Sequence, residues 1–129
     1  MAAVPENLLY DEADQWVRTD GGVATVGITD YAAGAVGTVE FLELPPPGKA
    51  LRRGEEGCVI ESSKAAFAVE APVSGTVVGI NTALEAKPGL VASDCYGRGW
   101  LYKIELADQA ELSDLMTPRQ YVRSLLDRG

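Results

Sequence analysis

The sequence predicts a mainly β protein, a flattened β-sandwich or barrel-like domain with a short N-terminal helix and two C-terminal helices. Three observations favour this class. About seven short runs are rich in β-forming residues, turn residues separate these runs, and the hydrophobic period becomes helical only near the C-terminus. The chain has 129 residues, of which 47% are hydrophobic. This is enough for one real core, so we expect residues 1–129 to form a single domain.

The first part of the chain is predicted to be a hairpin followed by a short helix. Residues 15–19 and 23–29 are rich in β-forming side chains and flank Asp20-Gly21-Gly22, in which Asp-Gly is a strong turn signal. Thr29 can cap a helix that ends at Gly37.

Five further strands are predicted in the middle of the chain. They are residues 38–44, 58–62, 66–71, the run that follows the turn at Ser74-Gly75, and 100–106. The stretches LEAKPGLV and SDCYGRG are predicted loops. Gly-Thr-Val occurs at both 37–39 and 75–77, a faint repeat that would fit two similar half-units packed face to face.

Two capping signatures near the C-terminus predict two short helices, at about 109–116 and 118–127. The signatures are Asp108 with Glu111 and Thr117 with Gln120, the second followed by Pro118 at the first helical position. The apolar face of the second helix is expected to pack against the core.

Composition excludes several classes of function. The 11 basic and 19 acidic residues give a net charge of −8, which repels polyphosphates, so we expect no nucleic-acid partner. There is no histidine, the commonest general base and metal ligand. No apolar run approaches the roughly 18 residues that suggest a membrane span. The acidic N-terminal stretch does not resemble a signal or transit peptide, so we expect a cytoplasmic protein.

The two cysteines are too few and too far apart in sequence for a zinc site, and we expect no metal. Cys58 lies in an apolar predicted strand and is expected to be a small buried residue. Cys95 lies in a predicted loop and is expected to be more exposed. A disulfide between them is not expected in a reducing compartment.

One lysine, Lys64, interrupts a run of small, apolar and acidic residues between two predicted strands. So few residues separate these strands that they should pair antiparallel, with Ser63-Lys64 at the hairpin tip. Ser62 and Ser63 suit a tight turn there. A tip lysine would project its amine away from the body of the protein, within reach of another enzyme.

The residues around Lys64 leave three interpretations open: a solubilising loop residue, a catalytic amine, or a site of covalent modification. A catalytic amine would need a lowered pKa, whereas an exposed tip near Glu61 favours the charged form. Small neighbours such as Ala65 leave room for a modifying enzyme to seat the lysine.

Family resemblance favours modification. The stretch ESSKA followed by APVSGTVVGIN resembles the lipoyl-lysine hairpin of the glycine cleavage H-protein family. The stretches VPENLLY…QWVR, VGITDYAAGAVG, YGRGWLYKIEL and ELSDLMTPRQYVRSLL resemble other parts of that family in the same order, so the resemblance covers nearly the whole chain. The Met-Lys-Met tip of biotin carriers is absent, which favours lipoate over biotin.

The resemblance implies a lipoyl (hammerhead) domain with lipoate attached to Lys64. The residues that it implies for recognition around the arm are Glu61, Ser62, Ser63 and Ala65. Pro72 and Gly75 would hold the second strand and its turn, mostly through backbone geometry. The protein would be a monomeric, non-catalytic carrier whose swinging arm shuttles a bound intermediate between enzymes.

The implied partners are a lipoate ligase or lipoyl transferase and a dihydrolipoyl dehydrogenase, together with one of two sets of enzymes. Departures from the family pattern favour the H-like lipoate-binding protein of the heterodisulfide-reductase-like sulfur-oxidation pathway, with that complex as its partner. Three departures are Asp14-Gln15-Trp16 for His-Glu-Trp, Ser63 for Val, and Val36-Gly37-Thr38 for Leu-Gly-Asp. The fourth is the sequence AVEAP at residues 68–72, where the family usually has a run that begins with Ser-Asp and ends with Ala-Pro.

The alternative is the glycine cleavage H protein, which carries an aminomethyl group from glycine decarboxylase to the aminomethyltransferase. A lipoate relay and an unmodified interaction module are further alternatives. Lys64 is the attachment site in every interpretation except the last.

Overall fold

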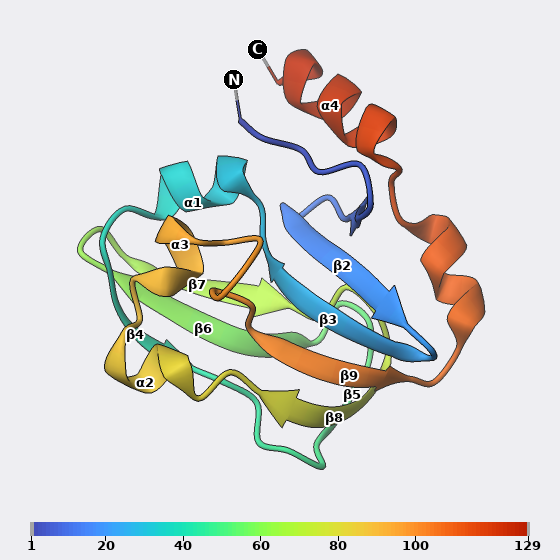
Figure 1. Cartoon of the computed structure of the whole chain (residues 1–129), viewed down its shortest axis with the longest axis horizontal. Coiled ribbons are helices and arrows are strands. Elements are labelled where there is room, and N and C mark those ends of the chain that lie inside the picture. Colours follow the sequence, from blue (N-terminus) through green and yellow to red (C-terminus); the bar gives the residue numbers. More distant parts are fainter. Residues whose placement is uncertain (1, 129) are drawn as a thin grey trace.

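Nine β-strands form two antiparallel sheets within residues 2–128, the residues that this computed structural model describes (Figure 1). The strands are β1 (Leu9–Tyr10), β2 (Gln15–Asp20), β3 (Val23–Ile28), β4 (Val39–Glu43), β5 (Ala50–Leu51), β6 (Glu56–Ser62), β7 (Ala66–Glu70), β8 (Gly75–Ile80) and β9 (Tyr102–Leu106). One sheet has the order β1-β2-β3-β9-β8-β5 and the other the order β4-β6-β7. The predicted mainly β sandwich is confirmed.

The helices lie at the ends of the sandwich (Figure 1). They are α1 (Asp30–Val36), α2 (Ala83–Ala86), α3 (Leu90–Ser93), the 3₁₀ helix η1 (Gln109–Asp114) and α4 (Pro118–Asp127). The predicted caps of α1 and α4 are confirmed. The Thr29 side chain accepts from Ala32 N, and Thr117 and Gln120 form a full capping box. Within residues 2–128, no helix is long and apolar enough to cross a membrane.

One local prediction is wrong. The stretch LEAKPGLV, predicted as a loop, contributes to the short helices α2 and α3 on either side of Pro88. The short helix predicted at about 109–116 is present, but it is a 3₁₀ helix that ends at Asp114. It ends there because Met116 pairs with Tyr10 through two backbone hydrogen bonds of 2.7 and 2.9 Å, and Leu115 must be extended to reach that strand.

The main core lies between the two sheets. Alternate residues of the strands point inward, so that Val26 and Ile104 of the larger sheet share one apolar cluster with Ile60 of the smaller sheet. Gly-Thr-Val at 37–39 leads into β4 and the same triplet at 75–77 opens β8, so the faint repeat is divided between the two sheets.

A second cluster fixes α4 to the N-terminal strands. Tyr10 and Tyr121 stack with their ring centroids 4.6 Å apart, and both side chains are fully buried beside Trp16. Trp16 Nε1 donates to the Cys95 carbonyl oxygen at 2.9 Å, which holds the loop that contains Cys95 over the sheet. Cys95 is therefore buried, and the expectation that it is more exposed is wrong. Cys58 is buried as predicted, and both thiols are free.

Candidate functional site

The hairpin between β6 and β7 carries Lys64 at its turn. Glu61 pairs with Ala66 as the last strand pair, and Ser62 N donates to the Ala65 carbonyl oxygen at 2.9 Å to close the turn. The Ser62 hydroxyl oxygen accepts from Lys64 N at 3.2 Å. The predicted antiparallel hairpin is thus present, and Ser62 builds its turn in the way expected of serine.

Lys64 is exposed at this turn. Its Nζ lies 3.4 Å from the Ala35 carbonyl oxygen, which is longer than an ordinary N–H···O hydrogen bond. Its aliphatic stem lies against Gly37 at the end of α1. The amine is outside the core and held only loosely, so an enzyme can reach it.

The residues around Lys64 form a small, open surface. Glu61, Ser63, Ala65 and Ala66 are exposed, and Ser62 is half-buried. Ser63 N donates to the Thr38 carbonyl oxygen at 2.9 Å, which ties the turn to the segment before β4. No side chain larger than serine immediately flanks the lysine.

An apolar cavity of about 200 Å³ lies between α1 and β7, close to the lysine turn. Its lining includes Ala35, which contacts Lys64, and Phe67 and Ala68 of β7. Asp14 is the charged residue in a lining otherwise made of alanine, valine, isoleucine and phenylalanine. The sequence marked Asp14 only as a departure from the family pattern and gave no sign of this cavity.

Asp14 is held by the distant C-terminal helix. It has a φ of 62°, which is uncommon for a residue other than glycine. Its carboxylate accepts from Tyr121 Oη and from Arg128 Nη1, each at 2.9 Å. A left-handed backbone conformation at a residue other than glycine is strained and persists only where surrounding contacts impose it. Here Tyr121 of α4 and Arg128 at its end supply those contacts.

Pro72 and Gly75 follow the C-terminal end of β7, whereas Lys64 precedes its N-terminal end. Pro72 is buried and lines a separate cavity beside Asp11. A Cβ at Gly75 would overlap the Glu105 carbonyl oxygen of the neighbouring strand. Both positions serve the backbone path between β7 and β8, and neither contacts the lysine turn.

The structure offers little for metal or thiol chemistry. No group of three or more His, Cys, Asp or Glu residues within the described part of the chain could hold a metal ion. Burial raises the pKa of the Cys58 thiol to about 12 and that of the Cys95 thiol to about 11. Both thiols therefore stay protonated at neutral pH and are poor nucleophiles.

Antiparallel sheets of this topology define a β-sandwich of the lipoyl-domain class. The chain superimposes on the crystal structure of a glycine cleavage system H protein from Mycobacterium marinum with a TM-score of 0.85, at 32% identity, covering 94% of this chain and 98% of that one. The family model described as glycine cleavage H-protein matches residues 8–128. The chain belongs to the glycine cleavage H-protein family.

Curated relatives agree over nearly their full lengths. The glycine cleavage system H protein of Bradyrhizobium diazoefficiens is 50% identical over 113 residues, covering 88% of this chain and 93% of the relative. That of Carboxydothermus hydrogenoformans is 40% identical over 129 residues, covering 100% and 99%. These names support the glycine-cleavage alternative rather than the sulfur-oxidation assignment that the sequence departures favoured.

Proposed function

We propose that this protein is the lipoyl carrier of a glycine cleavage system, with lipoate joined to Lys64 Nζ by an amide bond. In this role it carries an aminomethyl group from glycine decarboxylase to the aminomethyltransferase. The observation that carries the proposal is the exposed amine of Lys64 at the β6–β7 turn of a chain in this family.

The residues at the turn fit an acylated lysine. The contact between Lys64 and the Ala35 carbonyl oxygen is long at 3.4 Å, so little is lost when a ligase draws the amine away. The Ser62 hydroxyl oxygen accepts a hydrogen bond from Lys64 N, which fixes the backbone while the side chain moves. Glu61, Ser63 and Ala65 form the exposed surface that the ligase or lipoyl transferase would contact.

The chain anchors the arm, and partner enzymes perform the catalysis. When bound, lipoate would supply a cyclic disulfide, a two-electron couple in which the S–S bond breaks as one sulfur takes up the transferred group and the other becomes a thiol. Tethering at Lys64 raises the local concentration of that group at a partner's site to roughly millimolar values. The apolar cavity beside Ala35 offers a surface next to the anchor from which water is partly excluded.

Lipoylation in vitro tests the attachment site. The purified chain is incubated with lipoate, ATP and a lipoate–protein ligase, and intact mass and peptide mapping follow the reaction. We expect one lipoyl group on Lys64, none on Lys64→Arg, and normal modification of the control Lys49→Arg, which alters another exposed lysine. A lipoyl group on Lys64→Arg would refute the assignment.

The second step tests the pathway. The lipoylated chain is added to glycine decarboxylase, aminomethyltransferase, dihydrolipoyl dehydrogenase, tetrahydrofolate, glycine and NAD⁺, and NADH formation is recorded. We expect NADH formation that depends on the lipoylated chain and is absent with Lys64→Arg. A lipoylated chain that supports no turnover would refute the glycine-cleavage function while leaving the attachment site intact.

A further inference from the structure

A surface groove of about 390 Å³ lies between the two short helices α2 and α3 and the loop before β9. We call it the basic groove, and its lining residues are Asn81, Ala83, Ala86, Lys87, Leu90, Arg98 and Trp100. The lining combines mostly apolar side chains with two cations and includes no acidic residue. A third cation borders it, because Lys103 Nζ lies 5.2 Å from the centroid of the Trp100 ring.

Hydrogen bonds and close packing hold the lining of the basic groove in place. The buried Asn81 side chain donates from Nδ2 to the carbonyl oxygens of Arg98 and Trp100, at 2.6 and 2.8 Å. Gly99, between them, packs so closely on Leu90 that a Cβ would overlap the Leu90 carbonyl oxygen. A surface that is already fixed before binding loses little conformational entropy when a partner docks.

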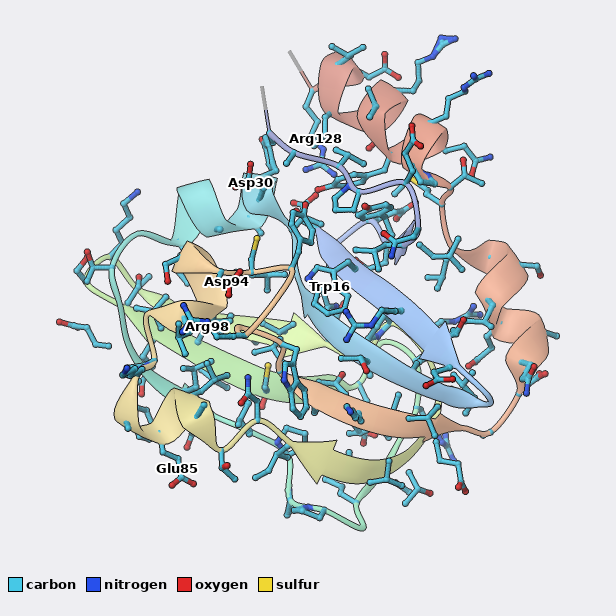
Figure 2. All side chains as sticks on the ribbon, viewed as in Figure 1. Trp16, Asp30, Glu85, Asp94, Arg98 and Arg128 are labelled. Atoms are coloured by element: carbon cyan, nitrogen blue, oxygen red, sulfur yellow. The ribbon has the colours of Figure 1, made fainter. Side chains whose placement is uncertain are left out.

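The charge of the basic groove is opposite to that of the chain as a whole, which is −8. Arg98 pairs through Nε with Asp94 at 3.1 Å, but its side chain is 74% exposed (Figure 2). Within residues 2–128, Lys87 and Lys103 form no ion pair. Glu85 belongs to α2 but lines a different hollow, against β4, and lies on the other side of that helix from Arg98 (Figure 2).

The basic groove lies at the same end of the sandwich as the lysine turn. Helix α3 packs against α1, and the C-terminal end of α1 carries Ala35 and its cap Gly37, which contact Lys64. Figure 1 shows α1, α2, α3 and the β6–β7 turn gathered at this end. An enzyme that receives an arm from Lys64 therefore approaches this end of the molecule.

We propose that the basic groove is the docking site for an acidic, partly apolar segment on an enzyme that exchanges a group with the Lys64 arm. The inference rests on the proposed carrier function, and it adds the chemistry of the partner's contact surface. Tryptophan and arginine are among the residues that most often dominate binding at protein interfaces. The flanking cations select an acidic segment and hold it in register, while Trp100 and Leu90 bury its apolar side chains.

Charge reversal separates this docking role from the function of the arm. The test compares the wild-type chain, Lys87→Glu/Arg98→Glu and the control Arg119→Glu/Arg123→Glu, which makes the same charge change on exposed residues of α4. Each is made with Lys64 intact and lipoylated, and again with Lys64→Arg. The probes are purified glycine decarboxylase, aminomethyltransferase and dihydrolipoyl dehydrogenase from the same organism.

For at least one enzyme we expect the groove variant to raise the KM for the lipoylated carrier by about 10-fold, with kcat unchanged. The control should stay within about 2-fold. In calorimetric titrations with that enzyme, the Lys64→Arg chain should bind as the wild type does and lose affinity when the groove is reversed. Because this second readout needs no lipoyl group, it reports on docking even if the carrier function fails.

Three outcomes would overturn the proposal. The first is an unchanged KM and affinity for all three enzymes. The second is an equal effect of the control variant, since that would show only the loss of overall charge balance. The third is self-association of the wild-type chain in sedimentation experiments that the groove variant abolishes, because the occupant would then be a second copy of this chain.

Discussion

Lys64 and Ala35 meet at the C-terminal end of α1, where the lysine Nζ lies 3.4 Å from the Ala35 carbonyl oxygen. The last turn of α1 contains no basic residue of its own. Lys64 therefore brings a cation from another element to carbonyl groups that carry the negative end of the helix dipole. This loose contact gives the unmodified side chain a preferred direction without burying it.

Gly37 is the position at which this contact can be disturbed. Its φ is 81°, and an added Cβ would lie 3.3 Å from Lys64 Cε. We expect Gly37→Ala to lower the free energy of unfolding by about 1–2 kcal/mol, mainly through backbone strain. In Gly34→Ala of the same helix the Cβ meets nothing within 4 Å, so we expect a gain of up to about 1 kcal/mol. Urea unfolding of both variants measures the difference, and equal effects would contradict the strain argument.

Arg128 connects the end of α4 to the strained Asp14 through an ion pair of 2.9 Å. The two side chains are 33% and 18% exposed, so solvent screens the pair only in part. We expect Arg128→Ala to cost about 1 kcal/mol of unfolding free energy, with a smaller loss at high salt. The exposed Arg123→Ala on the same helix should stay within about 0.5 kcal/mol of wild type. The Arg128 guanidinium also lies over the Tyr31 ring, 5.2 Å from its centroid, so a loss that is independent of salt would show that this packing, rather than charge, is the cause.

Asp11 should make stability depend on pH. Burial raises the pKa of its carboxyl group to about 6, although hydrogen bonds from Gln15 and Ala13 oppose the shift. The folded pKa lies above the unfolded value of about 4, so the folded state binds the proton more tightly. Asp11 therefore adds stability that is fully present below about pH 4 and is lost as the pH rises through about 6.

The variant Asp11→Asn removes this titration. Relative to Asp11→Asn, we expect the wild type to lose up to about 2 kcal/mol of unfolding free energy between pH 4 and 7, measured in urea. Glu12→Gln changes an exposed acid in the same turn and is the control. A difference between wild type and Asp11→Asn that does not change with pH would contradict the assignment.

Strands β8 and β9 approach so closely at position 75 that only glycine fits there. Because a Cβ there would overlap the Glu105 carbonyl oxygen, β8 and β9 would have to separate. We expect Gly75→Ala to lower the free energy of unfolding by about 2–3 kcal/mol. At Gly79 in the same strand, the nearest atom to an added Cβ is 3.9 Å away, so Gly79→Ala should change stability by less than about 0.5 kcal/mol. Thermal unfolding of the pair is a direct comparison, and similar midpoints would contradict it.

Local sequence signals predicted the elements that local physics controls. Asp20-Gly21-Gly22 gives the β2–β3 hairpin because two glycines adopt positive φ there, and the Thr117 capping box starts α4. Ser62 and Ser63 predicted the tight turn, and the Ser62 hydroxyl group bonds to the backbone of Lys64 and Ala65 there. Strand boundaries shifted by a residue or two, as expected where pairing with a neighbour decides where a strand ends.

The misjudged exposure of Cys95 and the early end of the helix predicted at 109–116 share a different cause. Cys95 was expected to be more exposed because it lies in a predicted loop, yet the Trp16 indole bonds to its backbone from far away in the sequence. The predicted helix at 109–116 ends early because Met116 pairs with Tyr10. In each case a long-range contact outweighed a local preference.

Side-chain pattern and hydrogen bonds within a few residues are enough to predict the sandwich class, the lysine at a hairpin turn and the family resemblance. The pathway assignment followed residue substitutions near the arm, and the comparisons favour the alternative. The ion pair between Asp14 and Arg128 became visible in the folded structure. So did the grouping of Lys87, Arg98 and Lys103 near Trp100. Those arrangements depend on how separate elements pack, because Asp14 is far from Arg128 along the chain and Lys87 lies on a different element from Trp100.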